Sequence, residues 1–304
     1  MMQDLAVVIV NYNTREDLDR CLATVPDAAA DLSYRTIVVD NASQDGSASM
    51  VRERHPWATV IETDHNGGYA YANNIGLRSV GLGEPGSGSR YALLLNPDTL
   101  LPPRALSRMV AFMDANEDVG VSGPKLVRRD GSLDKACRRS FPTPMVSFYR
   151  LSGLGSLFPK SRVFGRYNLT YLDEDAEADV DAVVGAFMLM RAEALAQAGL
   201  LDEAFFMYGE DIDLCYRIKE HGWRVVYHPQ VTVTHVKGTA SRKASLRATV
   251  AFYDAMRIFH DKHYRARTPA PVNWIIDGGI ALLKWSALLR NRLRSPMRRR
   301  VASA

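Results

Sequence analysis

In the stretch YALLLNPDTLLP, residues 91–102, a run of apolar and aromatic residues suited to a buried strand leads directly into Asn96, Pro97 and Asp98. Three other short apolar runs precede it in the chain, at residues 5–10 (LAVVIV), 36–39 (TIVV) and 58–62 (ATVIE). Their continuous apolar pattern is typical of strands buried on both faces of a sheet. Helix-like segments separate these runs, and alternation of strand and helix predicts a parallel α/β sheet.

The second half of the chain predicts further elements around an irregular insertion. Residues 137–179 contain prolines, glycines and scattered arginines, which indicates an insertion around a site. The apolar run 183–190 follows, and then a helix that closes at Gly199 and another over residues 211–222. Residues 223–235 read as two short strands, WRVVYHP and VTVTH.

Composition excludes several classes of protein. The chain has 304 residues, of which 47% are hydrophobic and 24% charged, an ordinary globular composition with room for a sizeable core. Its three cysteines are odd in number and far apart, so they indicate neither a disulfide framework nor a zinc site. No basic segment precedes the first apolar run, which is too short for a signal peptide. We therefore expect a reducing, cytosolic environment.

Polar side chains follow the predicted strands at three places. Asn11 and Asn13 follow the first strand, Asp40 and Asn41 the second, and Asn96 and Asp98 the fourth. Ligands of open α/β sheets bind outside the carboxyl ends of the strands, so these clusters converge on one edge. Each alone is compatible with a helix cap or a turn, because Asn and Asp are favoured there. Together they predict a ligand site, in which Asp40 suits a ribose or base contact.

The motif HNGGYAYANNIG, residues 65–76, puts Gly67 and Gly68 where a loop enters a helix. Backbone N–H groups left free at such a helix start can receive a phosphate or sugar hydroxyls, although a plain turn is equally compatible with the pair of glycines. A dinucleotide fold would need G-x-G-x-x-G directly after the first strand, where this chain has NYNTRED. Nicotinamide or flavin binding is therefore not expected.

Asp98 and His235 are candidate metal ligands. Mg²⁺ or Mn²⁺ is typically held by one or two carboxylates together with substrate phosphates, and Asp98 stands at a rigid strand end where it could do so. Its alternative role is to cap the helix that follows. His235 ends VTVTH and could act as a further ligand beside Asp98, or be a structural histidine.

Two adjacent carboxylates, Glu210 and Asp211, precede the helix within FFMYGEDIDLCYR. Acids at a helix start often only favour the helix dipole, but such a pair can also supply a general base. Asp213 should point away from Asp211 and pair with Arg217 one turn later, which indicates a structural ion pair.

The motifs VVIVNYN, VVDNAS, HNGGYAYANNIG, LLLNPDT, FFMYGEDIDLCYR and VTH followed by KGTAS together resemble those of glycosyltransferase family 2. Within that family they are most similar to the bacterial rhamnosyltransferases that build cell-wall linkers and O-antigens. The resemblance covers roughly residues 4–245. It implies a GT-A, Rossmann-like fold, a nucleotide-sugar donor, a divalent metal (Mg²⁺ or Mn²⁺) and inversion at the anomeric carbon. No covalent nucleophile is then needed.

The resemblance also implies roles for individual residues. Asp98 takes the place of the metal-binding aspartate of the D-x-D motif, but its first acidic position is Asn96, so the metal would depend more on the diphosphate and His235. Asp211 would be the catalytic base, with Glu210 as the second candidate. The donor would be held by Asn11, Asn13, Asp40, Asn41, Asn66, Gly67, Gly68, Tyr69 and Asn96, and the acceptor would lie beside Gly185 and Ala186.

The implied domain is residues 1–245, with a nucleotide-sugar-binding half (1–125) and an acceptor-binding and catalytic half (126–245). dTDP-rhamnose is the expected donor, and a UDP- or GDP-sugar is the alternative. The acceptor would be a polyprenyl-diphosphate-linked sugar whose diphosphate meets arginines of the insertion, namely Arg138, Arg139, Arg162 or Arg166. A non-catalytic scaffold protein is a rival that the intact acidic residues disfavour, and a nucleotidyltransferase would need a Gly-rich loop after the first strand.

The remaining extension, residues 246–304, ends in a basic, apolar helix. One face has Asn273, Asp277, Lys284 and Asn291, another has Ile276, Ile280, Leu283 and Ala287, and Trp274 and Trp285 flank them. Two charges interrupt the run, so an interfacial helix fits better than a spanning one. The arginines 290, 292, 294 and 298–300 would attract anionic lipid, which predicts a peripheral protein on the cytoplasmic face of the inner membrane. The alternative is packing on the protein's own core or in a homodimer. Nucleic acid is not expected, because no stacking aromatics are interleaved with the arginines.

Overall fold

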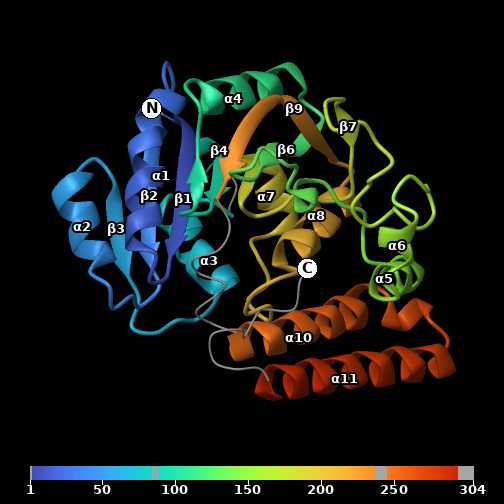
Figure 1. Cartoon of the computed structure of the whole chain (residues 1–304). Coiled ribbons are helices and arrows are strands. Elements are labelled where there is room, and N and C mark those ends of the chain that lie inside the picture. Colours follow the sequence, from blue (N-terminus) through green and yellow to red (C-terminus); the bar gives the residue numbers. More distant parts are fainter. Residues whose placement is uncertain (1, 84–85, 87, 237–244, 294–304) are drawn as a thin grey trace.

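A nine-stranded sheet forms the centre of the computed structural model, which describes residues 2–83, 86, 88–236 and 245–293. The strands are β1 (Gln3–Asn11), β2 (Tyr34–Asp40), β3 (Thr59–Glu62), β4 (Ser89–Leu95), β5 (Thr99–Leu100), β6 (Val119–Val127), β7 (Ala178–Asp179), β8 (Phe187–Arg191) and β9 (Arg224–His235). They are ordered β3-β2-β1-β4-β8-β6-β9-β5, and β7 pairs with β9. Figure 1 shows helices around this sheet and a hairpin of two long helices below it.

The helices are α1 (Arg15–Ala28), α2 (Ser47–Arg54), α3 (Tyr69–Ser79), α4 (Ala105–Ala115), α5 (Pro144–Leu151), α6 (Leu154–Leu157), α7 (Ala192–Ala198), α8 (Glu210–Glu220), α10 (Ser245–His263) and α11 (Ala270–Leu293). Short 3₁₀ turns lie at η1 (Lys135–Cys137) and η2 (Arg265–Arg267). The helices predicted after Asp98, up to Gly199 and over residues 211–222 are all present as α4, α7 and α8, with boundaries that differ by one or a few residues.

The first half of the sheet is the parallel α/β unit that the sequence predicts. β1 pairs in parallel with β2 and β4, and β2 with β3. Successive residues of β2 point to opposite faces: Val38 joins the main core, and Ile37 and Val39 join a second cluster with Ala72 of α3. Both faces are therefore covered, which is why these strands read as continuous apolar runs.

The second half is mixed. β8 is antiparallel to both β4 and β6, while β6 and β9 are parallel. The two strands predicted within residues 223–235 are one strand, β9, whose register against β6 shifts between Pro124 and Lys125. No strand was predicted over β6, because Gly120, Gly123 and Pro124 break its apolar pattern.

The C-terminal extension is a hairpin in which α10 and α11 run in opposite directions (Figure 1). The polar residues that were predicted to form one face of α11 contact residues of α10 and of the turn between the two helices. Asn273 bonds His260, Asp277 pairs with Arg265, Lys284 pairs with Asp254, and Asn291 bonds Thr249. The sequence predicted that the polar face of this helix is exposed to water, but in the structure that face lies inside the hairpin.

The surface that α11 leaves exposed is apolar. Its exposed large side chains are Val272, Trp274, Ile275, Leu282, Trp285 and Leu289. Trp274 and Ile275 are each 73% exposed. The predicted apolar face of Ile276, Ile280, Leu283 and Ala287 is instead half-buried. Arg294 and Arg298–Arg300 of the predicted basic cluster lie outside the described residues, whereas Arg290 and Arg292 fall in the last turn of α11.

Candidate active site

The ends of β1 and β2 are joined by a buried polar cluster. Asn11 donates to Asp40 Oδ1 (Nδ2 to Oδ1, 2.8 Å) and to Ser43 Oγ (3.0 Å). Asp40 Oδ2 accepts the backbone N–H of Ser43 at 2.9 Å. Asn13, which has a positive φ of 56°, accepts the N–H of Gln44 at 2.8 Å. The predicted nucleoside-binding residues thus lie together, and Ser43 is a member that strand-end reasoning missed because it sits inside a turn.

The next cluster organises the loop before α3. Asn41 donates to Asn66 Oδ1 at 3.0 Å and to the carbonyl of Gly68 at 3.1 Å. The N–H groups of Gly67 and Gly68 are accepted by the side chains of Asn41 (3.3 Å) and Asn66 (3.1 Å), and that of Tyr69 by the carbonyl of Phe206 (2.7 Å). The prediction that these N–H groups stay free for a phosphate is therefore wrong: protein groups already accept them.

Gly68 has a different purpose in this loop. Its φ is +99°, a conformation that side chains rarely adopt, and a Cβ there would lie 2.3 Å from the carbonyl oxygen of Phe206. The glycine allows the start of α3 to lie against the segment that leads into α8. This contact joins two of the predicted clusters.

Asp98 and His235 are brought together by strand pairing. In the short antiparallel pair of β5 and β9, Thr99 lies opposite His235, and Asp98 accepts the N–H of Val236 through its carbonyl at 2.8 Å. The Oδ1 of Asp98 then lies 3.2 Å from Nε2 of His235. Two residues more than 130 positions apart in the sequence are therefore neighbours in the structure, as a metal site shared by Asp98 and His235 requires.

A second carboxylate holds the other nitrogen of this histidine. Asp134, only 1% exposed, places Oδ2 2.9 Å from Nδ1 of His235. Burial by itself disfavours the charged imidazole, but the hydrogen bonds to Asp134 and Asp98 outweigh burial and raise the pKa of His235 to about 9. Sequence reasoning missed Asp134, since GSLDKA carries no strand-end signal.

This pair fits a divalent ion that is shared with a substrate. The Asp98 carboxylate is 16% exposed, so one side of it faces outward, and Nδ1 of His235 is oriented by a carboxylate as in many metal-bound histidines. Among the residues that the structure describes, no group of three or more His, Cys, Asp or Glu is arranged to hold a metal by itself. A hard cation bound here would need further oxygens, such as those of a diphosphate.

Asp211 opens α8 and is held by three groups. Its Oδ2 accepts from Nη2 of Arg139 at 2.5 Å and from the backbone N–H of Gly185 at 3.1 Å, and its Oδ1 from the N–H of Ile212 at 2.8 Å. The side chains of Arg139 and Asp211 are 10% and 7% exposed. Arg139 was predicted to contact the acceptor, but its guanidinium is paired with the candidate base.

Glu210 has a different environment. It is 6% exposed, and its Oε2 is buried with no hydrogen-bond partner among the described residues. Burial, followed by repulsion from Asp211, raises the pKa of Glu210 to about 8. The two adjacent carboxylates are therefore unequal: Asp211 is paired with Arg139, whereas burial favours the neutral form of Glu210.

Gly185 and Ala186 connect the clusters to one another. The N–H of Asn96 donates to the carbonyl of Ala186 at 3.0 Å, and the hydroxyl of Tyr69 donates to the carbonyl of Gly185 at 2.8 Å. A Cβ on Gly185 would lie 2.9 Å from that hydroxyl oxygen. Burial, then the nearby charges of Glu210 and Asp211, raise the pKa of Tyr69 well above its ordinary value. This segment thus contacts the loops of Asn96 and Tyr69 and, through the N–H of Gly185, the carboxylate of Asp211.

The arginines of the insertion divide into two groups. Arg138 is 2% exposed, donates to the carbonyls of Leu172 and Asp173, and lies over the ring of Tyr227 with 5.0 Å between guanidinium carbon and ring centre. Its Nη1 and Nη2 donate to backbone carbonyls and its Nε is buried, so Arg138 faces the interior of the protein. Arg162 and Arg166 are exposed.

Comparison with known proteins identifies the family of the chain. Residues 3–253 match the protein family described as "Glycosyltransferase like family 2". The chain is 28% identical over 309 residues to the N-acetylglucosaminyl-diphospho-decaprenol L-rhamnosyltransferase of Mycobacterium tuberculosis, an alignment that covers 99% of this chain and 98% of the relative. It is 23% identical to the rhamnosyltransferase WbbL of Escherichia coli, over 85% of this chain and 96% of that protein.

A solved structure shows the same fold. The mannosyltransferase PcManGT from Pyrobaculum calidifontis, determined with GDP-Man and Mn²⁺, aligns with a TM-score of 0.56 and 20% identity. The alignment covers 95% of this chain and 72% of that one. The predicted GT-A fold is thereby confirmed.

Proposed function

The chain belongs to glycosyltransferase family 2, and we propose that it transfers L-rhamnose from dTDP-rhamnose to a polyprenyl-diphosphate-linked sugar during cell-wall or surface-polysaccharide synthesis. The sugar and the acceptor are suggested by its two rhamnosyltransferase relatives, one of which is named for a lipid-diphosphate substrate. The observation that carries the proposal is the hydrogen-bonded path from the NPD loop through Ala186 and Gly185 to Asp211. This path connects the loop proposed to bind the donor diphosphate with Asp211, the proposed catalytic base.

In this proposal the donor lies along the carboxyl edge of the first four strands. The buried cluster of Asp40 and Asn11 shapes the strand ends that border the nucleoside, and the loop of Asn66 to Tyr69 borders the sugar. Asp98 and His235 would hold Mg²⁺ or Mn²⁺, and Asp134 fixes the imidazole through its other ring nitrogen. When bound, the cation neutralises the charge that develops on the leaving diphosphate.

Asp211 acts as the general base. As an acceptor hydroxyl attacks the anomeric carbon, its proton moves to the Asp211 carboxylate, a new carbon–oxygen bond forms, and the bond to the diphosphate breaks on the opposite face. The configuration therefore inverts. Arg139 and the N–H of Gly185 hold the carboxylate in one orientation, which favours in-line attack. Glu210, whose pKa is raised by burial, would supply a hydrogen-bond donor beside it.

The exposed face of α11 is the proposed membrane contact. Ala270–Arg292 is the one helix in the described part of the chain that is long and apolar enough to span a membrane. It packs lengthwise on α10 through its paired polar residues, so we propose that it lies in the interface on the cytoplasmic side. Trp274 and Trp285 would enter the headgroup region, and Arg290 and Arg292 would attract anionic lipid. A lipid-linked acceptor would then arrive along this surface.

Donor turnover tests the reaction. The assay measures binding and hydrolysis of dTDP-, UDP- and GDP-sugars with and without Mg²⁺ or Mn²⁺, for wild type, Asp98→Ala and Asp211→Asn. We expect metal-dependent selection of dTDP-rhamnose, weaker metal binding in Asp98→Ala, and intact donor binding without turnover in Asp211→Asn. Binding of no nucleotide sugar under any condition would remove the proposed function.

Vesicle sedimentation tests the membrane contact. Full-length protein should sediment with phosphatidylglycerol-containing vesicles, and the double variant Trp274→Ser/Trp285→Ser should stay in solution. Trp57→Ser is the matched control, because Trp57 is an exposed tryptophan (40%) outside the hairpin. Equal sedimentation of the double variant and the control would contradict the assignment of this face, and a concentration-dependent dimer lost in the double variant would assign it to a second copy.

A further inference from the structure

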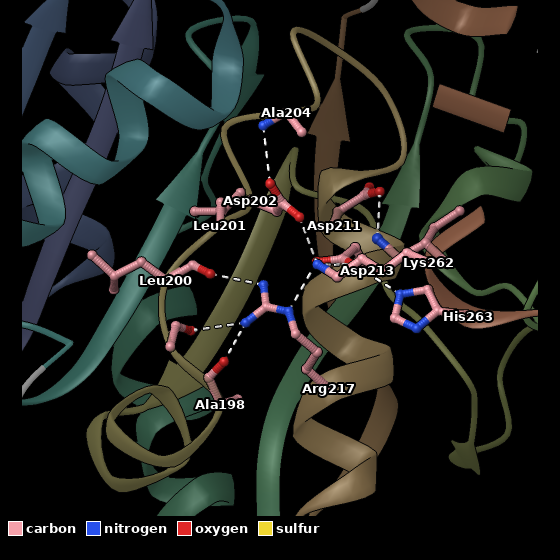
Figure 2. A network of polar contacts seen from close by, with 12 residues as sticks. Ala198, Leu200, Leu201, Asp202, Ala204, Asp211, Asp213, Arg217, Lys262 and His263 are labelled. Atoms are coloured by element: carbon pink, nitrogen blue, oxygen red, sulfur yellow. Dashed lines mark hydrogen bonds and ion pairs between the residues drawn. The ribbon is translucent and has the colours of Figure 1, made fainter. Parts of the chain in front are cut away.

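The C-terminal hairpin reaches the catalytic helix at one buried carboxylate. Asp213 lies in the first turn of α8, two residues after Asp211, and its side chain is fully buried. Figure 2 shows three side chains converging on it, Arg217 from the same helix and Lys262 and His263 from the last turn of α10. Asp213 Oδ1 lies 2.7 Å from Nε2 of His263 and 2.9 Å from Nζ of Lys262.

The partners of Asp213 are themselves anchored. Lys262 also pairs with Asp202 at 2.6 Å, and Arg217, whose Nε lies 2.9 Å from Asp213 Oδ2, donates to the carbonyls of Ala198 and Leu200 (Figure 2). The network therefore ties three segments together: the first turn of α8, the end of α10, and the loop between α7 and α8.

Ring packing adds to the same contact. The ring of His263 lies against Tyr216 of α8, with ring centres 4.0 Å apart and a 36° angle between the planes. Phe259 of α10 packs edge-on against the same tyrosine at 6.0 Å. The hairpin therefore meets α8 through both charge and shape.

Electrostatics makes the two α10 residues necessary for this arrangement. Burial alone would raise the pKa of Asp213, but its hydrogen bonds and ion pairs outweigh burial and lower that pKa to about 2. A buried carboxylate that loses part of its countercharge must reach water or another cation. Because Asp213 is within the first turn of α8, such a movement would carry Asp211 with it.

We propose that Lys262 and His263 are positioning residues for the reaction, which hold the first turn of α8 through Asp213 so that Asp211 keeps its orientation. Both lie beyond residue 253, where the family match ends. The inference rests on the proposed function for the identity of the reaction. It makes the C-terminal hairpin part of the catalytic apparatus, in addition to its exposed surface.

The test compares two lysines of the same hairpin. Lys262→Met removes a charge from Asp213, while Lys284→Met removes one from Asp254, a pair that joins α11 to α10 at 2.6 Å without touching α8. The two lysine side chains are similarly exposed, at 32% and 29%. Lys262→Arg keeps the charge and serves as the conservative rescue.

Two measurements are made on the full-length proteins: donor hydrolysis, with dTDP-rhamnose and Mn²⁺ as probes, and hydrogen–deuterium exchange. In donor hydrolysis, we expect Lys262→Met to lower kcat at least tenfold with the donor KM within twofold of wild type, and Lys262→Arg to recover most of kcat. In hydrogen–deuterium exchange without ligand, amides of residues 210–216 should exchange faster in Lys262→Met than in Lys284→Met.

The outcomes separate this inference from the proposed function. A wild-type protein that turns over no nucleotide sugar would refute the function, and the exchange comparison alone would then decide the positioning role. Equal exchange of residues 210–216 in the two lysine variants overturns that role. So does an active wild type in which Lys262→Met and Lys284→Met share the same kcat.

Discussion

Replacing Arg139 with methionine should destabilise the protein through Asp211. The Arg139 Nη2 to Asp211 Oδ2 contact of 2.5 Å joins two side chains that are at most 10% exposed, so solvent screens them little. Removing one partner of a buried pair leaves an uncompensated charge, which costs about 3–5 kcal/mol. For a chain of 304 residues, the usual unfolding entropy of about 2.1 cal/mol/K per residue converts this into a fall in Tm of about 5–8 °C.

The double variant distinguishes an ion pair from general packing. Asp211→Asn alone strands the Arg139 charge and should cost a similar amount, whereas Arg139→Met/Asp211→Asn contains neither charge and should regain most of the loss. Arg138→Met is the control: it is an equally buried neighbouring arginine that bonds backbone carbonyls, so its cost should add to that of Asp211→Asn. Thermal unfolding at pH 7 measures wild type, the three single variants and the two double variants Arg139→Met/Asp211→Asn and Arg138→Met/Asp211→Asn. Simple additivity for Arg139 and Asp211 would refute the reasoning.

Three further predictions concern single sites. In metal-free protein, the stabilisation from His235 is complete below its ordinary pKa of 6.5 and disappears as pH rises to about 9, so urea unfolding should show this loss in wild type and not in His235→Gln. Burial raises the pKa of Glu210 from 4.5 to about 8, so its neutral form is favoured in the folded protein and the free energy of unfolding falls as pH rises between those values. Glu210→Gln should lack this slope, and an unchanged slope in that variant would contradict the prediction. Gly68→Ala should cost more than Gly46→Ala, by about 1–3 kcal/mol, because Gly68 combines φ +99° with ψ 179° and meets the Phe206 carbonyl, whereas Gly46 is left-handed helical with no neighbour near. Equal losses on denaturant unfolding would contradict this.

The predicted site depended on signals of different strength. Strand ends were visible because buried parallel strands give continuous apolar runs, and the residues after them, Asn11, Asp40 and Asp98, do lie at one edge. The strand β6 was not predicted because its glycines and proline interrupt the apolar pattern, and without β6 the mixed half of the sheet was not predicted either. Asp134 gave no signal at all, since its importance comes from a histidine 101 residues away.

The sequence by itself determined local facts: the strands of the parallel half of the sheet, several helices, and which carboxylates open a helix. These follow from residue preference and periodicity within a short window. Only the tertiary structure decided which charges meet. Arg139 proved to be the partner of Asp211 instead of an acceptor ligand, and the polar residues of α11 turned inward. Pairing between distant residues depends on strand register and helix packing, and the energy of a buried charge depends on neighbours that no local pattern names.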